Sequence, residues 1–217
     1  MEKGTKGTWI RIADLRELFA ERYPELIAIS EDGNVIIRGS FPIVHEGEVL
    51  DRFSIELRIP RNFPDSIPIL RETSGRIPRI LDRHINANGE SCPLVPEEWL
   101  LLLREERTIP SFLDGPVRNF FLFQALKERG ESWPWGERPH GRRGLLQSYA
   151  EMLGIAEDLV PAYLYCLSRN ELKGHLDCPC GSSKRLRSCH IEQVRDLRDK
   201  ISVELAKSAE ARLKSMK

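Results

Sequence analysis

The sequence predicts an α+β fold in which one helix precedes an antiparallel meander of four strands, and further helices follow. Three observations support this prediction. Near the start of the chain, apolar residues recur with the period of a helix. Segments with strand character and strong turn signals follow, and helical spacing returns from residue 109. A Cys- and His-rich stretch near the C-terminus indicates an additional small helical appendage.

The first helix is expected over residues 10–23, because Pro24 cannot continue it. Its apolar residues recur at helical spacing and share one face: Ile10, Ile12, Leu15, Leu18 and Phe19. Asp32-Gly33 is a strong signal for a tight turn between the first two strands. The four strands themselves are expected in residues 26–30, 34–44, 51–60 and 67–73.

Prolines recur between residues 60 and 96, which predicts an irregular segment on the surface. A helical pattern resumes at Ile109 and runs to residue 128, with Gly115-Pro116 as a break or a fresh start. Later helices are expected over residues 145–153, 156–170 and 191–216. These patterns divide the chain into a core, a loop with a helical extension, and a Cys-rich stretch with its helix: residues 1–130, 131–172 and 173–217.

Composition limits the class of protein to which the chain can belong. Of 217 residues, 41% are hydrophobic and 30% charged, the balance of a folded globular protein. Lys plus Arg equals Asp plus Glu at 33 each, so the net charge gives no reason to expect a nucleic acid or a membrane as partner. From residue 178 onward ten Lys and Arg face five Asp and Glu, an excess of +5 that fits a solvated helix face or a surface for an acidic partner.

The expected location is a reducing cytoplasm. The N-terminus shows no apolar run of the kind that a signal peptide contains. Five cysteines, an odd number, argue against a disulfide framework and favour metal-binding or catalytic thiols.

The stretch CPCGSSKRLRSCH, residues 178–190, carries the most specific signal in the chain. It supplies the four donors of a tetrahedral zinc site within thirteen residues: Cys178, Cys180, Cys189 and His190. The alternative is a set of unrelated thiols. The stretch resembles the SEC-C zinc motif, whose pattern is Cys-Pro-Cys-Gly-Ser, a basic stretch and then Cys-His. With four protein ligands and no open position, the zinc is expected to be structural or partner-binding.

A second candidate site is the loop DRHINANGESCPLVPEEW, residues 82–99, which contains Cys92. Asn88-Gly89 predicts a turn and Pro93 removes a backbone donor, so Cys92 is expected in a reachable loop. A thiol attacks as a thiolate and must be accessible, a condition that this position meets. Taken alone, a loop cysteine of this kind is more often structural or incidental.

The order of the elements resembles that of the ubiquitin-conjugating enzymes over about residues 8–125. The resemblance is carried by NFPDSIP after the strands, HINANGESC with the cysteine, Trp99 and the step RTIPSFL into a helix. It implies that Cys92 is the catalytic thiol, with His84 and Asn86 beside it, and that the asparagine stabilises an oxyanion.

The sequence departs from the family pattern in two respects. Ile85 stands where the family has the proline of His-Pro-Asn, and the interval from His84 to Cys92 is two residues shorter. For His84 and Asn86, a role in bracing the loop is therefore the alternative to a role in catalysis.

The segments GPVRNFF and WPWGER, together with the SEC-C-like stretch, narrow the resemblance to a prokaryotic branch found in short type II CBASS anti-phage operons. This resemblance implies that Cys92 forms a thioester with the C-terminus of a cGAS/DncV-like nucleotidyltransferase. The acyl group then passes to lysine amines of target proteins and raises signalling output. The sequence shows no nucleotide-binding glycine loop, so activation of the carboxylate is expected to come from elsewhere.

Two other functions remain open. A non-catalytic adaptor with the same fold would bind the nucleotidyltransferase or its effector, and the short interval between His84 and Cys92 is compatible with this. A zinc-dependent nucleic-acid binder has only the basic tail in its favour. The loop of residues 133–144 either binds a partner or caps the core through Trp133 and Trp135, and Cys166 is expected to be a core thiol.

Overall fold

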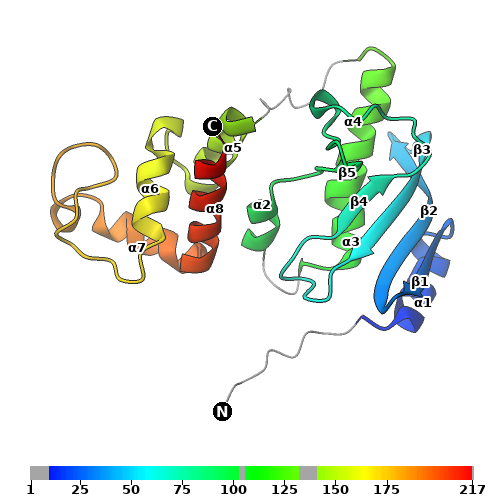
Figure 1. Cartoon of the computed structure of the whole chain (residues 1–217), viewed down its shortest axis with the longest axis horizontal. Helices are drawn as coiled ribbons and strands as arrows, with labels where there is room; N and C mark the ends of the chain where they lie inside the picture. The colour runs from blue at the N-terminus through cyan, green and yellow to red at the C-terminus, as the bar shows by residue number, and fades with distance from the viewer. Residues whose placement is uncertain (1–9, 103–105, 132–140, 217) are drawn as a thin grey trace. The chain divides into compact units, whose positions relative to one another are not determined.

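The computed structural model describes residues 10–102, 106–131 and 141–216 (Figure 1). The chain divides into two compact units, residues 1–137 and 138–217, called here the first and the second unit. The sequence suggested a helical extension over residues 131–172 and a separate Cys-rich part over 173–217; the described residues 141–216 of both lie in the second unit. Each unit has a hydrophobic core of its own.

The first unit contains a helix followed by an antiparallel sheet, as predicted. Helix α1 (Ile12–Arg22) precedes five strands whose spatial order follows their order in the chain. The strands are β1 (Leu26–Glu31), β2 (Asn34–His45), β3 (Glu48–Ile59), β4 (Ile69–Glu72) and β5 (Glu90–Ser91). The fifth strand was not predicted. It arises because part of the segment expected to be irregular pairs with β4.

Two tight turns set the register of the long strands. Asp32 and Gly33 both have positive φ, 51° and 72°, and Glu46 and Gly47 repeat this at 51° and 85°. Two consecutive residues with positive φ form the type I′ turn, whose twist matches that of the strands it joins. The hairpin predicted at Asp32-Gly33 is thereby confirmed.

The helices of the first unit follow the sheet in sequence. They are α2 (Pro96–Leu101), α3 (Ile109–Phe112), the π-helical turn η3 (Leu113–Val117) and α4 (Arg118–Glu128), with the short 3₁₀ helix η1 (Leu81–Arg83) between β4 and β5. The sequence predicted a break or a fresh start at Gly115-Pro116. The structure instead widens the helix there into a π turn, which accommodates a proline that has no N–H to donate.

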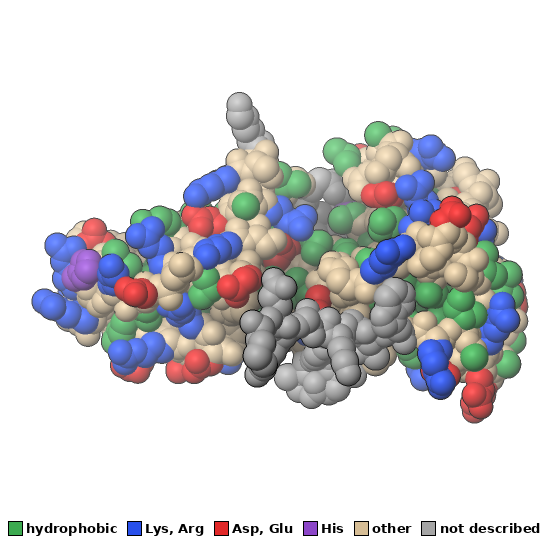
Figure 2. Space-filling view, turned by 60° about the horizontal axis from the view of Figure 1, so that its bottom comes forward, with side chains coloured by type: hydrophobic (Ala, Val, Ile, Leu, Met, Phe, Trp, Pro, Cys, Tyr) green, Lys and Arg blue, Asp and Glu red, His purple; other side chains and the backbone are tan. Residues whose placement is uncertain are grey.

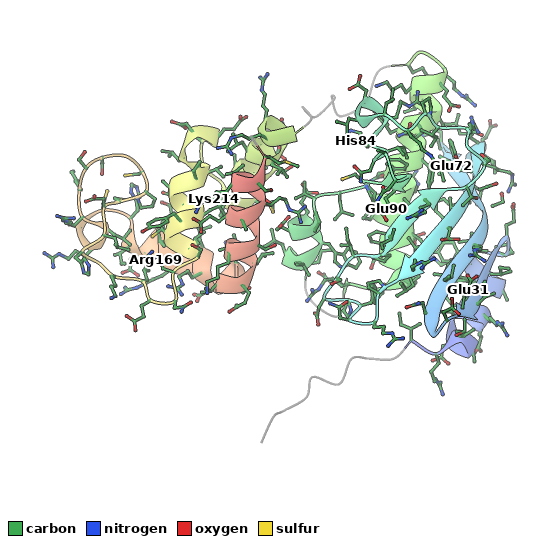
Figure 3. All side chains as sticks on the ribbon, viewed as in Figure 1. Glu31, Glu72, His84, Glu90, Arg169 and Lys214 are labelled. Atoms are coloured by element: carbon green, nitrogen blue, oxygen red, sulfur yellow. The ribbon has the colours of Figure 1, made fainter. Side chains whose placement is uncertain are left out.

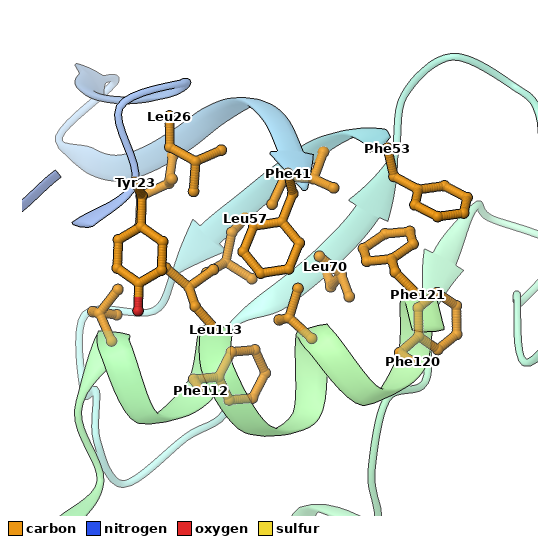
Figure 4. Packing of buried hydrophobic residues seen from close by; sticks show 14 of the residues in the cluster. Tyr23, Leu26, Phe41, Phe53, Leu57, Leu70, Phe112, Leu113, Phe120 and Phe121 are labelled. Atoms are coloured by element: carbon orange, nitrogen blue, oxygen red, sulfur yellow. The ribbon is translucent and has the colours of Figure 1, made fainter. Parts of the chain in front are cut away.

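The core of the first unit lies between the sheet and the helix that runs from α3 to α4 (Figure 4). Phe53 of β3 stacks on Phe121 of α4 with ring centroids 4.7 Å apart. Along β3 the buried side chains alternate with solvent-facing ones, as the sequence predicted: Phe53, Ile55, Leu57 and Ile59 are buried. This packing fixes α4 against the sheet, so segments that contact α4 are anchored to the core.

Gly39 of β2 is required by a close backbone approach. Its φ is 149°, and a Cβ atom there would lie 2.0 Å from the Glu25 carbonyl oxygen. We expect Gly39→Ala to lower the free energy of unfolding by roughly 3 kcal/mol or more, because both the φ value and the overlap must be relieved. Urea denaturation measures this change.

The matched control is Gly47→Ala, which has a positive φ of 85° and nothing within 4 Å of the added methyl group. Its expected cost is only about 1 kcal/mol. Equal costs for the two variants would show that the contact with Glu25 is not decisive.

The second unit is helical. It contains α5 (Gly141–Leu153), η4 (Glu157–Leu159), α6 (Val160–Leu167), η5 (Leu186–Ser188), α7 (Ile191–Lys200) and α8 (Val203–Ser215). Helix α6 packs against α5, α7 and α8 and carries Cys166, which is buried as predicted. Helix α5 begins inside the loop expected at 133–144, and Trp133 and Trp135 lie outside the described residues.

The single helix predicted over residues 191–216 is wrong, because the structure has two. Ile201 is extended, with φ −120° and ψ 109°, and is buried. Ser202 then caps α8, its hydroxyl accepting from the Leu205 N–H at 3.1 Å. On the face shown in Figure 2, Lys and Arg side chains of this unit are interspersed with Asp and Glu side chains.

Candidate functional site

The segment around Cys92 is a tight hairpin in which β5 is one arm. The Cys92 N–H donates to the His84 carbonyl oxygen at 2.9 Å, and the Asn86 N–H donates to the Glu90 carbonyl oxygen at 2.8 Å. These two bonds flank an antiparallel bridge between residues 85 and 91. The three residues that the sequence singled out in this loop are therefore brought together by backbone pairing.

The turn of this hairpin lies where the sequence predicted it. The Gly89 N–H donates to the Asn86 carbonyl oxygen at 2.8 Å, and the Glu90 N–H donates to the Asn88 side-chain oxygen at 3.0 Å. Gly89 has a φ of 81°, the left-handed residue that closes a three-residue hairpin loop. The Arg79 guanidinium lies against it, so a Cβ atom at residue 89 would come 3.4 Å from that group.

Side-chain direction separates the two faces of the hairpin. Ile85 and Ser91, which are opposite each other, are buried, whereas Asn86 and Cys92 are exposed. Asn86 and Cys92 are diagonal neighbours across the ladder, a relation in which residues lie roughly 7–8 Å apart. The alternation places the amide and the thiol on the same exposed face.

His84 is positioned differently from the other two candidates. Its φ is 51°, a left-handed conformation that is uncommon for residues with a side chain. Its ring packs edge-on against Phe123 of α4, with centroids 6.2 Å apart, and Figure 3 shows His84 near that helix. The imidazole thus contacts helix α4.

The chain that follows the thiol is fixed to the core. Cys92 Sγ makes a weak contact with the Leu94 carbonyl oxygen at 3.9 Å, and α2 then begins at Pro96. Trp99 of α2 is buried, and its Nε1 donates to the Pro64 carbonyl oxygen at 3.2 Å. The tryptophan and the Phe-Pro segment, both part of the family resemblance, are therefore in direct contact.

The residues of α4 that hold this hairpin were not predicted from the sequence. Gln124 is fully buried, and its amide donates to the Arg83 carbonyl oxygen at 2.9 Å and accepts from Arg83 Nε at 2.7 Å. Lys127 donates to the Asp82 carbonyl oxygen at 3.2 Å. A signal was present, because Gln124 is the single polar residue in the run FFLFQAL, residues 120–126.

The second candidate site is the predicted Cys/His cluster, and the structure brings its four members together. Their possible ligand atoms all lie within 4.8 Å of one another: Cys178, Cys180, Cys189 and His190. Nδ1 of the histidine lies 3.3 Å from Cys178 Sγ and 3.2 Å from Cys189 Sγ, and the Cys180 and Cys189 sulfurs are 3.7 Å apart. This group could hold a metal ion.

The donor atoms fit one tetrahedral ion. With metal–sulfur distances of about 2.3 Å and metal–nitrogen distances of about 2.0 Å, tetrahedral S···S and S···N separations are roughly 3.8 and 3.5 Å. The sulfur pair at 3.7 Å matches this separation, and the two S···N distances are shorter by a few tenths of an ångström. Small side-chain shifts suffice to bind an ion among them.

Local backbone structure forms the cluster. The Cys178 N–H donates to the Lys184 carbonyl oxygen at 2.8 Å and the Leu186 N–H to that of Leu176 at 2.8 Å, which makes a small hairpin. Gly181, with φ 76°, turns the chain directly after the first two cysteines. The third cysteine and the histidine lie between η5 and α7, so a hairpin and a helix entry supply two donors each.

The thiols of the cluster have different acidities. Burial raises the pKa of Cys178 to about 11, whereas the Ser182 hydroxyl, 3.2 Å from Cys180 Sγ, lowers the pKa of Cys180 to about 6. A bound metal deprotonates coordinating thiols outright. Burial also raises the pKa of Cys166, which keeps this core thiol protonated at neutral pH.

The chain matches no protein-family model, no curated protein and no solved structure. Within the described ranges, no helix combines the length and the apolar content that crossing a membrane requires.

Proposed function

We propose that this chain is a ubiquitin-conjugating-like acyl carrier that uses Cys92 as its nucleophile. The observation that carries the proposal is the hairpin itself, which presents an exposed thiol directly after a sheet strand and is held by the core helix α4. The order of helix, meander, thiol hairpin and closing helices supports the same assignment. We place this chemistry in a reducing cytoplasm, where a thiol persists.

The proposed reaction consists of two acyl exchanges. The Cys92 thiolate attacks the activated C-terminal carbonyl of a cGAS/DncV-like nucleotidyltransferase, and the activating group leaves with its electron pair. A lysine amine of a target protein then attacks the thioester, an amide forms, and the Cys92 thiolate is released. The amine loses one proton to solvent or a base during the second step. The product is an isopeptide conjugate that promotes anti-phage signalling.

Asn86 supports the second step in this proposal. An amide on the same exposed face as the thiol can donate to the oxyanion that develops when the amine attacks. His84 is assigned a bracing role, because its ring packs on Phe123. The histidine therefore contributes to the shape of the hairpin and not to proton transfer.

We propose zinc as the metal of the cluster and a structural role for it. Three thiols and one imidazole are the soft donors that zinc prefers, and four protein donors leave no position for a substrate. Zinc would hold the hairpin that precedes α7 against the start of that helix. No step of the acyl transfer passes through it.

The test uses a peptide with the C-terminal residues of the nucleotidyltransferase, prepared as a thioester of a small thiol. This donor supplies the activated carbonyl, so no activating enzyme is required. Intact mass spectrometry of the zinc-loaded protein should show an adduct of one peptide acyl group, which hydroxylamine at neutral pH removes. Peptide mapping should place it on Cys92. Binding of the nucleotidyltransferase without any adduct would instead support the non-catalytic adaptor.

A further inference from the structure

The carbonyl groups of residues 82, 83 and 84 are each bound by a different donor. Lys127 Nζ binds the first at 3.2 Å, Gln124 Nε2 the second at 2.9 Å, and the Cys92 N–H the third at 2.9 Å. Two of these donors belong to α4 and the last is the backbone of the thiol residue. A continuous path of hydrogen bonds and backbone therefore links the core helix to Cys92.

Gln124 is the central member of this path. It is fully buried, and both ends of its amide are used by Arg83. A buried amide in an otherwise apolar run costs free energy unless it is hydrogen-bonded, and an apolar residue would fill the same space without that cost. Packing against the sheet does not require a polar residue at position 124. The hydrogen bonds that hold Arg83 in place do require one.

The neighbouring residues are constrained in the same way. His84 has a φ of 51°, a conformation that persists in a non-glycine residue when its surroundings determine it. Its ring packs on Phe123, and the Lys127 ammonium lies over the same Phe123 ring, 5.6 Å from its centre. Residues 123, 124 and 127 thus present one face of α4 to the turn at 82–84.

We propose that Gln124 is a positioning residue that fixes the Cys92 thiol for acyl transfer through Arg83 and His84. The inference rests on the proposed function. Transfer between a thioester and an amine requires a defined direction of attack, and a misplacement of about 1 Å can cost on the order of 100-fold in rate. Alkylation of a thiol by a small reagent requires only access, so the two reactions respond differently when the support is removed.

The test compares Gln124→Leu with the wild-type full-length protein. Three quantities are measured: deuterium exchange of the Cys92 amide by NMR, the rate of Cys92 alkylation by iodoacetamide, and kcat and KM for transfer from the peptide thioester to a lysine donor. We expect exchange at least about tenfold faster, alkylation within about twofold, kcat lower by about tenfold or more, and KM unchanged.

The matched control is Val117→Ala, which removes buried volume from the same helical segment outside the face that contacts residues 82–84. It should lower the melting temperature and leave the three quantities unchanged. Gln124→Glu keeps the acceptor for Arg83 Nε and loses the donor to the carbonyl, so intermediate values are expected. If Gln124→Leu does not fold, the same three quantities are compared between Gln124→Glu and the wild type.

The inference is overturned if Gln124→Leu keeps the exchange rate and kcat of the wild type, or if Val117→Ala reproduces its losses. A wild-type protein that accepts no acyl group contradicts the proposed function, and that result is separate because exchange and alkylation do not depend on transfer. Faster exchange together with unchanged kcat also overturns the inference, since the path would then support the fold without positioning the thiol.

Discussion

Cys92→Ala is expected to abolish the covalent adduct, with transfer at least about 1,000-fold below that of the wild type. All five cysteines lie in the described residues, and Cys92 alone is exposed among them. Cys166 is buried, and the other three belong to the Cys/His cluster that could hold a metal ion. Without Cys92, no exposed thiol outside the cluster remains among the described residues, and alanine cannot form an acyl bond. Intact mass spectrometry after incubation with the peptide thioester measures the effect.

Two variants make this result specific. Cys166→Ala also removes a thiol, but a buried one, and should keep the full adduct. Cys92→Ser should accept the acyl group slowly as an oxyester that hydroxylamine at neutral pH removes less readily than the thioester. An adduct that persists in Cys92→Ala would end the assignment of this residue as nucleophile.

Loss of the proposed zinc ion is expected to unfold the Cys-rich hairpin of the second unit. Cys178→Ala should lower the zinc content of the purified protein from one ion per chain to below about 0.1. In zinc-finger peptides structural zinc contributes about 10–16 kcal/mol of apparent binding free energy, so its loss should far exceed the effect of one missing thiol. Metal analysis and amide exchange over residues 174–190 are the measurements, and a strong chelator should reproduce the effect in the wild type.

His175→Ala is the matched control for the cluster. This histidine precedes the first cysteine and is exposed, and it is outside the group of four donors. The His175→Ala variant should retain one zinc ion per chain and the wild-type rate of amide exchange over residues 174–190. A wild-type protein that binds no zinc at micromolar concentration, or a Cys178→Ala variant with full zinc content, would contradict the proposed metal site.

The strands and turns of the first unit were predictable because their signals are local. Asp32-Gly33 forces positive φ at two consecutive positions, and the alternation from Phe53 to Leu57 defines which face of β3 is buried. The sequence did not reveal that Pro116 lies in a continuous helix, because a proline read from the sequence alone predicts a helix break. It also did not reveal the break at Ile201, because the apolar spacing of 191–216 continues across it.

The cluster of Cys178, Cys180, Cys189 and His190 was determined by the sequence itself. Its four donors lie within thirteen residues, so a hairpin and one turn bring them together without help from distant elements. The position of the thiol hairpin depends on the tertiary structure. Gln124 contacts Arg83 across a separation of 41 residues, and no local pattern encodes which buried helix face meets that turn. The exposed loop position of Cys92 was therefore predictable from the sequence, whereas the contacts that hold its hairpin depend on the packing of α4 against the sheet.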